Sequence, residues 1–137
     1  MPFPNHIIMV ASENDALRRG KVGGLSDVIR DLPPALAAQG RSVDILLPSY
    51  GFLHKENQSR KYKDVRFPFG GRIETCEVYQ VEPKNPNPGI RHFVIEHGGL
   101  RGEPIYFNDP PDTPFLRDAE KFALFCSAVE DVISVRR

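Results

Sequence analysis

A lysine next to two adjacent glycines is the segment of this sequence best suited to chemistry. Gly20-Lys21-Val22-Gly23-Gly24-Leu25 follows an apolar run and precedes a segment of helical periodicity. Lysine supplies a mobile positive charge that suits a phosphate. Glycines let backbone amides approach an anion closely and accept positive φ without penalty. We therefore predict a diphosphate-binding loop; the alternative is that the glycines only turn the chain and Lys21 is solvated.

Two strands and a helix must position this loop. Residues 6–11 and 43–48 are short apolar runs, typical of buried strands in a parallel sheet. Between them, apolar residues recur at steps of three and four, the spacing of an amphipathic helix: Leu25, Val28, Ile29, Leu32, Leu36 and Ala37. The result is a βαβ unit with a right-handed crossover. Ligands of such sheets bind outside the carboxyl ends of the strands, where the Lys21 loop lies.

Local signals set the expected limits of this helix. Ser26 stands where an N-cap belongs, and Asp27 where a first-turn acid belongs. Gly40 is expected to end the helix. Pro33 and Pro34 are expected to kink or restart it, because proline lacks a backbone donor and collides with the preceding turn.

After residue 50 the pattern changes. Residues 65–69, 73–81 and 91–96 predict strands, with Gly70-Gly71 and residues 83–89 as turns. Residues 55–64 are polar and predict a loop or a frayed turn. Residues 115–135 predict a helix whose buried stripe holds Phe122, Phe125, Val129, Val132 and Ile133, and whose polar residues off the stripe are Asp118, Glu120, Lys121 and Glu130.

Composition narrows the class of protein. The 137 residues carry 18 Lys plus Arg and 18 Asp plus Glu, a net charge of zero that argues against nucleic acid as a partner. The longest apolar runs have five residues (7–11 and 122–126), and a membrane span needs about 20. Cys76 and Cys126 lack the spacing of a redox pair or metal site. We expect two buried, reduced thiols in a cytoplasmic protein without a leader segment.

Residues 21–28, Lys-Val-Gly-Gly-Leu-Ser-Asp-Val, resemble the Lys-x-Gly-Gly-Leu-x-Asp-Val signature of bacterial glycogen synthases and plant starch synthases. The likeness extends to Ser12-Glu13 and to residues 31–36 and 43–50, and more loosely to Tyr106 and residues 120–125. These enzymes are retaining glucosyltransferases of the GT-B fold that use ADP-glucose. The resemblance implies an α/β fold: a Rossmann-like parallel sheet with helices on both faces, forming part of an N-terminal GT-B domain, with an antiparallel β-hairpin insertion.

The resemblance also implies roles for individual residues. Lys21 would contact the phosphate region of the donor, and Gly23 and Gly24 would line the cleft for diphosphate and glucose. Asp27 would orient the loop or the sugar hydroxyls, or it would be only a first-turn helix acid. Glu13 and Tyr106 match the family in residue type and are candidates for the same cleft. The segment between Ser12 and Lys21 has eight residues instead of six, which leaves the acceptor contacts open.

As a whole, residues 1–137 are expected to form one incomplete N-terminal domain of a glycogen or starch synthase. The family's second half binds most of the nucleotide, so the chain alone is not expected to transfer glucose to the non-reducing end of an α-1,4-glucan. Expected partners are ADP-glucose and α-glucan, without nucleic acid, membrane, metal or cofactor, and with a homo-oligomer through the surface that a partial domain exposes. The alternative function is a non-catalytic, stand-alone module that binds glucan, a sugar phosphate or a partner chain.

Three other groupings are weaker. Glu96-His97-Gly98-Gly99 is similar to an oxyanion-hole loop of esterases, but no Gly-x-Ser-x-Gly elbow accompanies it. His92, His97 and Glu96 lack the spacing of a helical metal-ligand pair, and hydrogen-bonded roles are expected for them. A basic cluster surrounds Tyr62 and is interpreted as a solvated face, comprising Lys55, Arg60, Lys61, Lys63 and Arg66.

Overall fold

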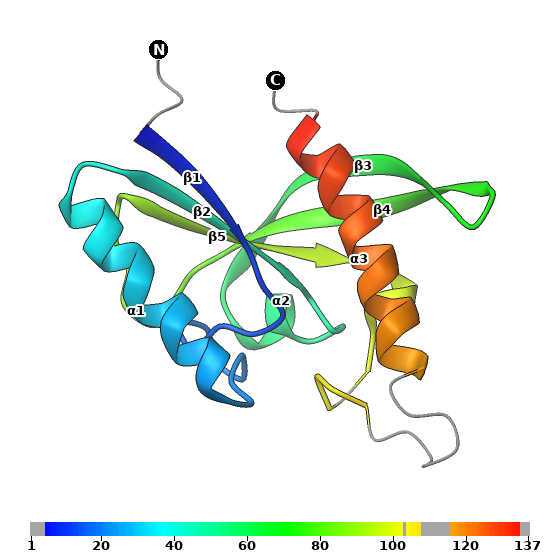
Figure 1. Cartoon of the computed structure of the whole chain (residues 1–137), viewed down its shortest axis with the longest axis horizontal. Helices are drawn as coiled ribbons and strands as arrows, with labels where there is room; N and C mark the ends of the chain where they lie inside the picture. Colours follow the sequence, from blue (N-terminus) through cyan, green and yellow to red (C-terminus); the bar gives the residue numbers. More distant parts are fainter. Residues whose placement is uncertain (1–4, 103, 108–115, 135–137) are drawn as a thin grey trace.

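The computed structural model describes residues 5–102, 104–107 and 116–134. Their five strands form one mixed sheet in the order β1-β2-β5-β4-β3 (Figure 1). The three parallel strands are β1 (His6–Val10), β2 (Ser42–Pro48) and β5 (Ile90–Glu96). The sheet continues antiparallel through β4 (Arg72–Val81) and β3 (Ser59–Phe69), which form a long hairpin. The predicted α/β class, with its parallel sheet and antiparallel hairpin, is confirmed.

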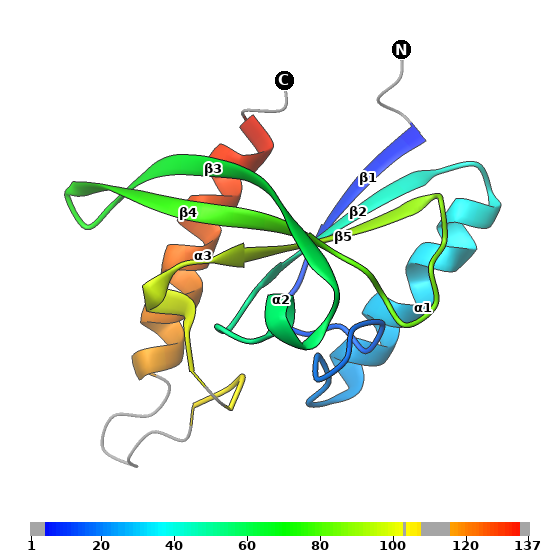
Figure 2. The same cartoon turned by 180° about the vertical axis from the view of Figure 1, so that it is seen from behind.

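Helices α1 (Gly24–Ala38) and α3 (Leu116–Ser134) cover opposite faces of this sheet (Figures 1 and 2). The alternation of side chains in β2 shows this directly. Leu46 packs in the cluster that includes α3, whereas Ile45 and Leu47 pack in the cluster that includes Ile29 of α1. Successive residues of a strand point to opposite faces, so one buried strand contributes to two cores.

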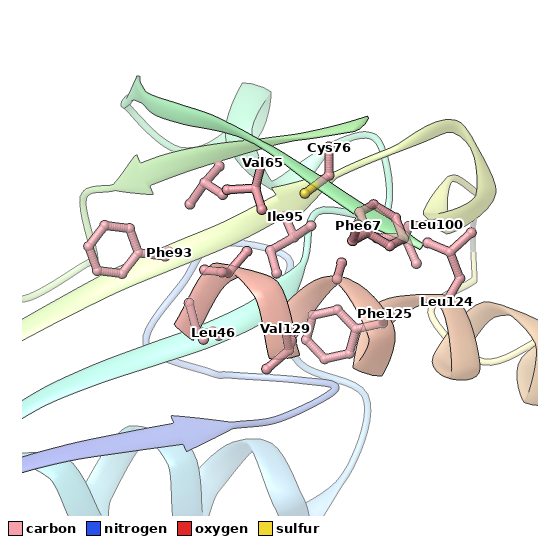
Figure 3. Packing of buried hydrophobic residues seen from close by; sticks show 13 residues of the cluster. Leu46, Val65, Phe67, Cys76, Phe93, Ile95, Leu100, Leu124, Phe125 and Val129 are labelled. Atoms are coloured by element: carbon pink, nitrogen blue, oxygen red, sulfur yellow. The ribbon is translucent and has the colours of Figure 1, made fainter. Parts of the chain in front are cut away.

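The core under α3 is the larger of these two clusters. Figure 3 shows Phe125 and Val129 of α3 among Leu46, Ile95 and Phe67 of the sheet. The apolar stripe predicted for this helix therefore faces the sheet. Residues 115 and 135, the expected ends of the helix, lie outside the described residues.

The first helix continues through both prolines, so the expected restart does not occur. Pro33 is buried with Ile29, and Leu36 packs against the same core. Burial of this face holds the helix together although Pro33 and Pro34 donate no backbone hydrogen bonds. Gly40 ends the helix as predicted: its φ is +83°, and its amide donates to the Ala37 carbonyl.

The prediction of a loop over residues 55–64 is wrong. A short helix α2 (Leu53–Glu56) comes first, and β3 begins at Ser59. Strand β3 pairs with β4 along its whole length, from Ser59 opposite Val81 to Phe69 opposite Arg72. Residues 60–64 are polar because β3 is an edge strand of the described sheet. Side chains of such a strand are exposed to solvent, although its backbone still pairs with the neighbouring strand on one side.

The two cysteines differ in environment. Cys76 is buried in the α3-side core, and burial raises the pKa of its thiol to about 11. Cys126 is exposed on α3, so the expectation that both thiols are buried is wrong for this residue. Both are free thiols. None of the described helices is long and apolar enough to cross a membrane.

Replacing Phe67 by alanine tests the packing of α3 on the sheet. Phe67 is 1% exposed, so Phe67→Ala should lower the free energy of unfolding by about 3–5 kcal/mol through lost burial and an unfilled cavity. Ile73→Ala is the control, because Ile73 on the same hairpin is 57% exposed and should change stability by less than about 0.5 kcal/mol. Urea unfolding followed by circular dichroism measures both. Equal effects of the two substitutions would contradict the packing described here.

Candidate functional site

The segments that follow β1, β2 and β5 meet at the carboxyl edge of the parallel strands. They lie in the lower half of Figure 1: the loop after β1, the short α2, and residues 104–107 beyond the 3-10 turn η2 (Gly98–Leu100). Two carboxylates are buried there, Glu13 after β1 and Glu96 at the end of β5. The edge that commonly binds ligands in open α/β sheets is thus built from polar groups.

Glu13 is hydrogen-bonded to the first turn of α1. Its Oε1 accepts the amide of Gly23 at 2.7 Å and the amide of Ser26 at 3.1 Å. Ser26 was predicted to be the N-cap, but the N-cap is Gly23, and the Ser26 hydroxyl donates to the Gly23 carbonyl at 2.6 Å. A carboxylate at a helix N-terminus is favoured both by these amides and by the helix dipole.

Tyr106 links Glu13 to the other strand ends. Its hydroxyl donates to Glu13 Oε2 at 2.5 Å, so the Ser12 hydroxyl, 2.6 Å away, donates to Tyr106. Tyr50 follows β2, and its hydroxyl donates to the Ser12 carbonyl at 2.5 Å. Burial, together with the bond to Glu13, raises the pKa of Tyr106 to about 12. The sequence-predicted residues Glu13 and Tyr106 are therefore in direct contact, 93 positions apart.

Helix α3 fixes the segment that carries Tyr106. Lys121 is 2% exposed; its ammonium donates to the Ile105 carbonyl and pairs with Asp118 at 3.0 Å. Asp118 also accepts the Phe107 amide at 3.0 Å, and the Lys121 nitrogen lies 3.9 Å from the centre of the Phe107 ring. Asp118 and Lys121 were predicted to lie off the buried stripe, which is wrong. They are buried because they satisfy backbone groups on either side of Tyr106.

The long loop between Ser12 and Lys21 is closed upon itself. The backbone amide of Asn14 donates to the Gly20 carbonyl at 2.8 Å. Leu17 is buried in the α1-side core. Gly20 is required for this closure, because a Cβ there would lie 2.2 Å from the Asn14 carbonyl oxygen. The segment between Ser12 and Lys21 is two residues longer than the family pattern, yet it folds into a compact turn. Lys21 follows this turn directly.

Lys21 lies on the surface beside the first turn of α1. Its ammonium donates to Asp27 at 2.7 Å, which raises the pKa of Lys21, and its side chain is 48% exposed. Asp27 is therefore the partner of the lysine as well as a first-turn acid. Its carboxylate is also 3.4 Å from Arg30.

The adjacent glycines behave differently from expectation. Neither takes a positive φ: Gly23 is extended and Gly24 begins the helix. The amides of Gly23 and Ser26 were expected to be free for an anion, but Glu13 takes them. What the glycines provide is open space, because a Cβ on Gly24 would meet nothing within 4 Å. An anion reaching Lys21 would thus meet bare backbone at Gly24.

Some polar residues of this edge had no signal in the sequence. Ser49 donates to Glu96 at 2.5 Å, and Arg101 donates to the same carboxylate at 2.9 Å. The signals available for Lys121 were the loose family likeness of residues 120–125 and its spacing of three from Asp118, typical of an ion pair on one helix face. Such spacing does not distinguish a buried pair from a solvated one.

The other groupings take structural roles. His97 pairs with Glu74 of β4 at 2.8 Å, and His92 is bonded to Asn14 at 3.0 Å. Among the described residues, no three His, Cys, Asp or Glu side chains are grouped as metal ligands would be. In the basic cluster, Lys61 pairs with Asp64 at 2.7 Å and with Glu77 at 3.2 Å, in keeping with a solvated face.

The structure is an α/β sheet whose polar carboxyl edge carries the Lys-x-Gly-Gly loop. This combination is typical of glycosyltransferases of the glycogen and starch synthase type. Comparisons with known proteins identify the family. Residues 6–136 match the starch synthase catalytic domain. The chain belongs to this family.

Individual relatives agree with this assignment. Glycogen synthase of Anoxybacillus flavithermus is 30% identical over 84% of this chain, and soluble starch synthase 3a of Oryza sativa subsp. japonica is 31% identical over 93%. The chain spans 22% of the first relative and 6% of the second. The catalytic domain of starch synthase IV from Arabidopsis thaliana, bound to ADP and acarbose, superposes with a TM-score of 0.77 over 96% of this chain and 25% of its own length. At 22% identity, this likeness shows the shared fold.

Gly20→Ala tests the loop closure. The added methyl group would collide with the backbone carbonyl of Asn14. We therefore expect the free energy of unfolding to fall by about 2–4 kcal/mol. Gly24→Ala is the matched control: its methyl group meets no atom, and alanine favours a helix, so stability should be unchanged or higher by up to about 1 kcal/mol. Thermal unfolding of both variants provides the measurement. A Gly20→Ala variant as stable as the parent chain would refute the closed loop.

Glu13→Gln tests the carboxylate at α1. Burial opposes ionisation of Glu13, but the Tyr106 hydroxyl and the Gly23 and Ser26 amides outweigh it and hold its pKa below 4.5. At pH 7 the substitution should cost about 2 kcal/mol, because charge-assisted hydrogen bonds are lost.

Acidification should remove the contribution of Glu13 to the stability of the folded chain. The pKa of Glu13 is lower in the folded chain than in the unfolded chain, so below about pH 4.5 the unfolded state takes up the proton first. The stability that Glu13 provides is present above that pH and is lost as the pH falls through the folded pKa. Chemical unfolding is measured at several values between about pH 3 and pH 7. On acidification, the free energy of unfolding should fall less in Glu13→Gln than in the exposed control Glu56→Gln. Parallel pH profiles would exclude the role given to Glu13.

Proposed function

We propose that this chain forms the N-terminal side of the catalytic cleft of a glycogen or starch synthase that transfers glucose from ADP-glucose to the non-reducing end of an α-1,4-glucan. Family membership supports the enzyme class. The Arabidopsis thaliana structure of the same fold holds ADP and acarbose, which supports a nucleotide and a glucan-like sugar as ligands. Because the chain spans a fraction of its relatives' length, the complete activity is proposed for an enzyme that contains this segment.

The observation that carries the proposal is the exposed Lys21 ammonium beside the first turn of α1, the helix that begins at Gly24, at the carboxyl edge of the sheet. A donor diphosphate placed there would be neutralised by Lys21. Stabilising negative charge on the departing nucleoside diphosphate is usually a large part of catalysis in such transfers. Gly23 and Gly24 would line the approach because they have no side chains to obstruct it.

The neighbouring residues would prepare this position rather than react. Glu13 holds the first turn of α1 through the Gly23 and Ser26 amides, and Tyr106 holds Glu13. Asp27 keeps the Lys21 ammonium beside the helix until a phosphate replaces it as the partner. We assign no proton-transfer or nucleophilic step to any of these side chains.

Two further features belong to the proposal. The reaction would take place in the cytoplasm, where free thiols such as Cys76 and Cys126 stay reduced. A second copy of the chain would dock on the apolar outer side of α1, where Leu25, Val28 and Leu32 are exposed.

Transfer of glucose by the complete enzyme that contains this segment provides the test. Lys21→Ala should lower turnover of ADP-glucose by about tenfold, equivalent to about 1.4 kcal/mol, because the cation facing the phosphates is lost. Lys55→Ala is the control, since Lys55 is an exposed lysine of α2. Steady-state kinetics with ADP-glucose and glycogen measures both variants. Unchanged kinetics in Lys21→Ala would remove Lys21 from the donor site, and glucan binding without any glucose transfer would favour the stand-alone module.

A further inference from the structure

Helix α3 carries a lysine that is almost completely buried. Lys121 is 2% exposed, although lysine side chains are rarely enclosed unless they are paired. Its ammonium donates to the Ile105 carbonyl and pairs with Asp118 at 3.0 Å. The same nitrogen lies 3.9 Å from the centre of the Phe107 ring and 5.3 Å from that of Tyr50. The lysine thus connects α3 with segments at the carboxyl edge of the sheet.

Stability alone does not account for this lysine. Burial of a charge is costly even when the charge is paired, and an apolar side chain of similar length would fill the space at less cost. What the ammonium adds is direction, because its hydrogen bond fixes the backbone at Ile105. Asp118 does the same at Phe107, whose amide lies 3.0 and 3.2 Å from its two carboxylate oxygens. Lys121 and Asp118 therefore fix the backbone on either side of Tyr106.

Tyr106 connects this pair to helix α1. Its hydroxyl donates to one oxygen of Glu13 at 2.5 Å, and the other oxygen of Glu13 accepts two amides at the start of α1. Because hydrogen bonds are directional, a displaced Tyr106 would also displace the carboxylate that holds this first turn. Asp27 lies in the same turn and accepts the Lys21 ammonium at 2.7 Å. A series of bonded contacts thus leads from α3 to the lysine of the proposed donor site.

We infer that Lys121 is a positioning residue for glucosyl transfer: through Tyr106 and Glu13 it holds the start of α1 in one arrangement. In that arrangement the Lys21 ammonium is placed for the departing diphosphate, so the inference rests on the function proposed for Lys21. Lys121 itself does not touch a substrate, because protein encloses its ammonium. Its effect on turnover passes through the residues that it holds.

A double-mutant cycle in the complete enzyme tests this inference. Ile105 is buried in the α1-side core, so Lys121→Met should shift its segment without releasing it. We expect kcat with ADP-glucose to fall by about tenfold while KM changes by less than about threefold. In a Lys21→Ala background the same substitution should lower kcat by less than about twofold, because the group that Lys121 positions is already absent. A residue that only stabilises the fold would give equal losses in both backgrounds.

Hydrogen–deuterium exchange of the same enzyme gives a readout that does not depend on activity. Lys121→Met should speed exchange in residues 22–26 as well as in residues 105–107, and should leave β2 unchanged. Lys121→Arg should restore exchange and bring kcat within about threefold of the parent enzyme, because it keeps the charge and the donors. A hollow of about 270 Å³ lined by Lys121 offers space for the larger group. Lys55→Met is the matched control, since this exposed lysine of α2 should affect neither measurement.

Tyr106→Phe is a second variant that serves if Lys121→Met fails to fold. It keeps the buried lysine and removes only the hydroxyl that reaches Glu13, so it should give the same faster exchange in residues 22–26. Unchanged exchange there, or equal kcat losses in the two backgrounds, would overturn the positioning role. A Lys21→Ala enzyme with parental kinetics would instead contradict the proposed donor site, and the exchange data would still decide whether Lys121 holds α1.

Discussion

The carboxyl edge of this sheet depends on a single buried carboxylate bonded to a helix terminus. Glu13 leaves β1 and accepts the amides of Gly23 and Ser26, so it fixes where α1 begins and at what angle it crosses the sheet. The same carboxylate accepts the Tyr106 hydroxyl and thereby connects α1 to a segment held by α3. Without this anion, the Gly23 amide would lose its partner, and the Ser26 amide and the half-buried Tyr106 hydroxyl would each lose one of theirs, which is costly.

This arrangement changes how an anion would be bound at the loop. In many α/β proteins a phosphate is bound by the free amides at a helix N-terminus. Here the protein's own carboxylate occupies those amides, and a second carboxylate, Asp27, holds the lysine. In the proposed donor site the positive charge would come from Lys21, and Gly24 adds no side chain at the start of α1. Such a site would use one mobile charge instead of a cage of amides.

Helix α1 separates two surfaces of different character. Its first turn faces the exposed cation, where charge would dominate recognition. Its middle, at Arg30 and Pro33, borders a groove that His92 also lines, and there Arg30 is paired with Asp15 and Asp31.

Much of the fold follows from local pattern. The βαβ unit, the hairpin around Gly70-Gly71 and the last helix were predictable, because hydrophobic periodicity and glycine turns are properties of neighbouring residues. The Lys-x-Gly-Gly-Leu segment also marked the correct edge of the sheet. Polar residues 60–64 were misassigned, because edge pairing with β4 is a contact between segments that the periodicity of either one does not record.

The sequence by itself determined that the lysine loop joins the first strand to the first helix, since the βαβ unit follows from the chain's local periodicity, and this connection places the loop at the carboxyl edge of the parallel strands. The tertiary structure alone decided what each polar group bonds to. Glu13 replaced Ser26 as the acceptor at the helix terminus, and Lys121 became buried beneath the Tyr106 segment. Those choices depend on groups about 10 to 90 positions apart meeting in space, and only long-range packing brings them within hydrogen-bond distance.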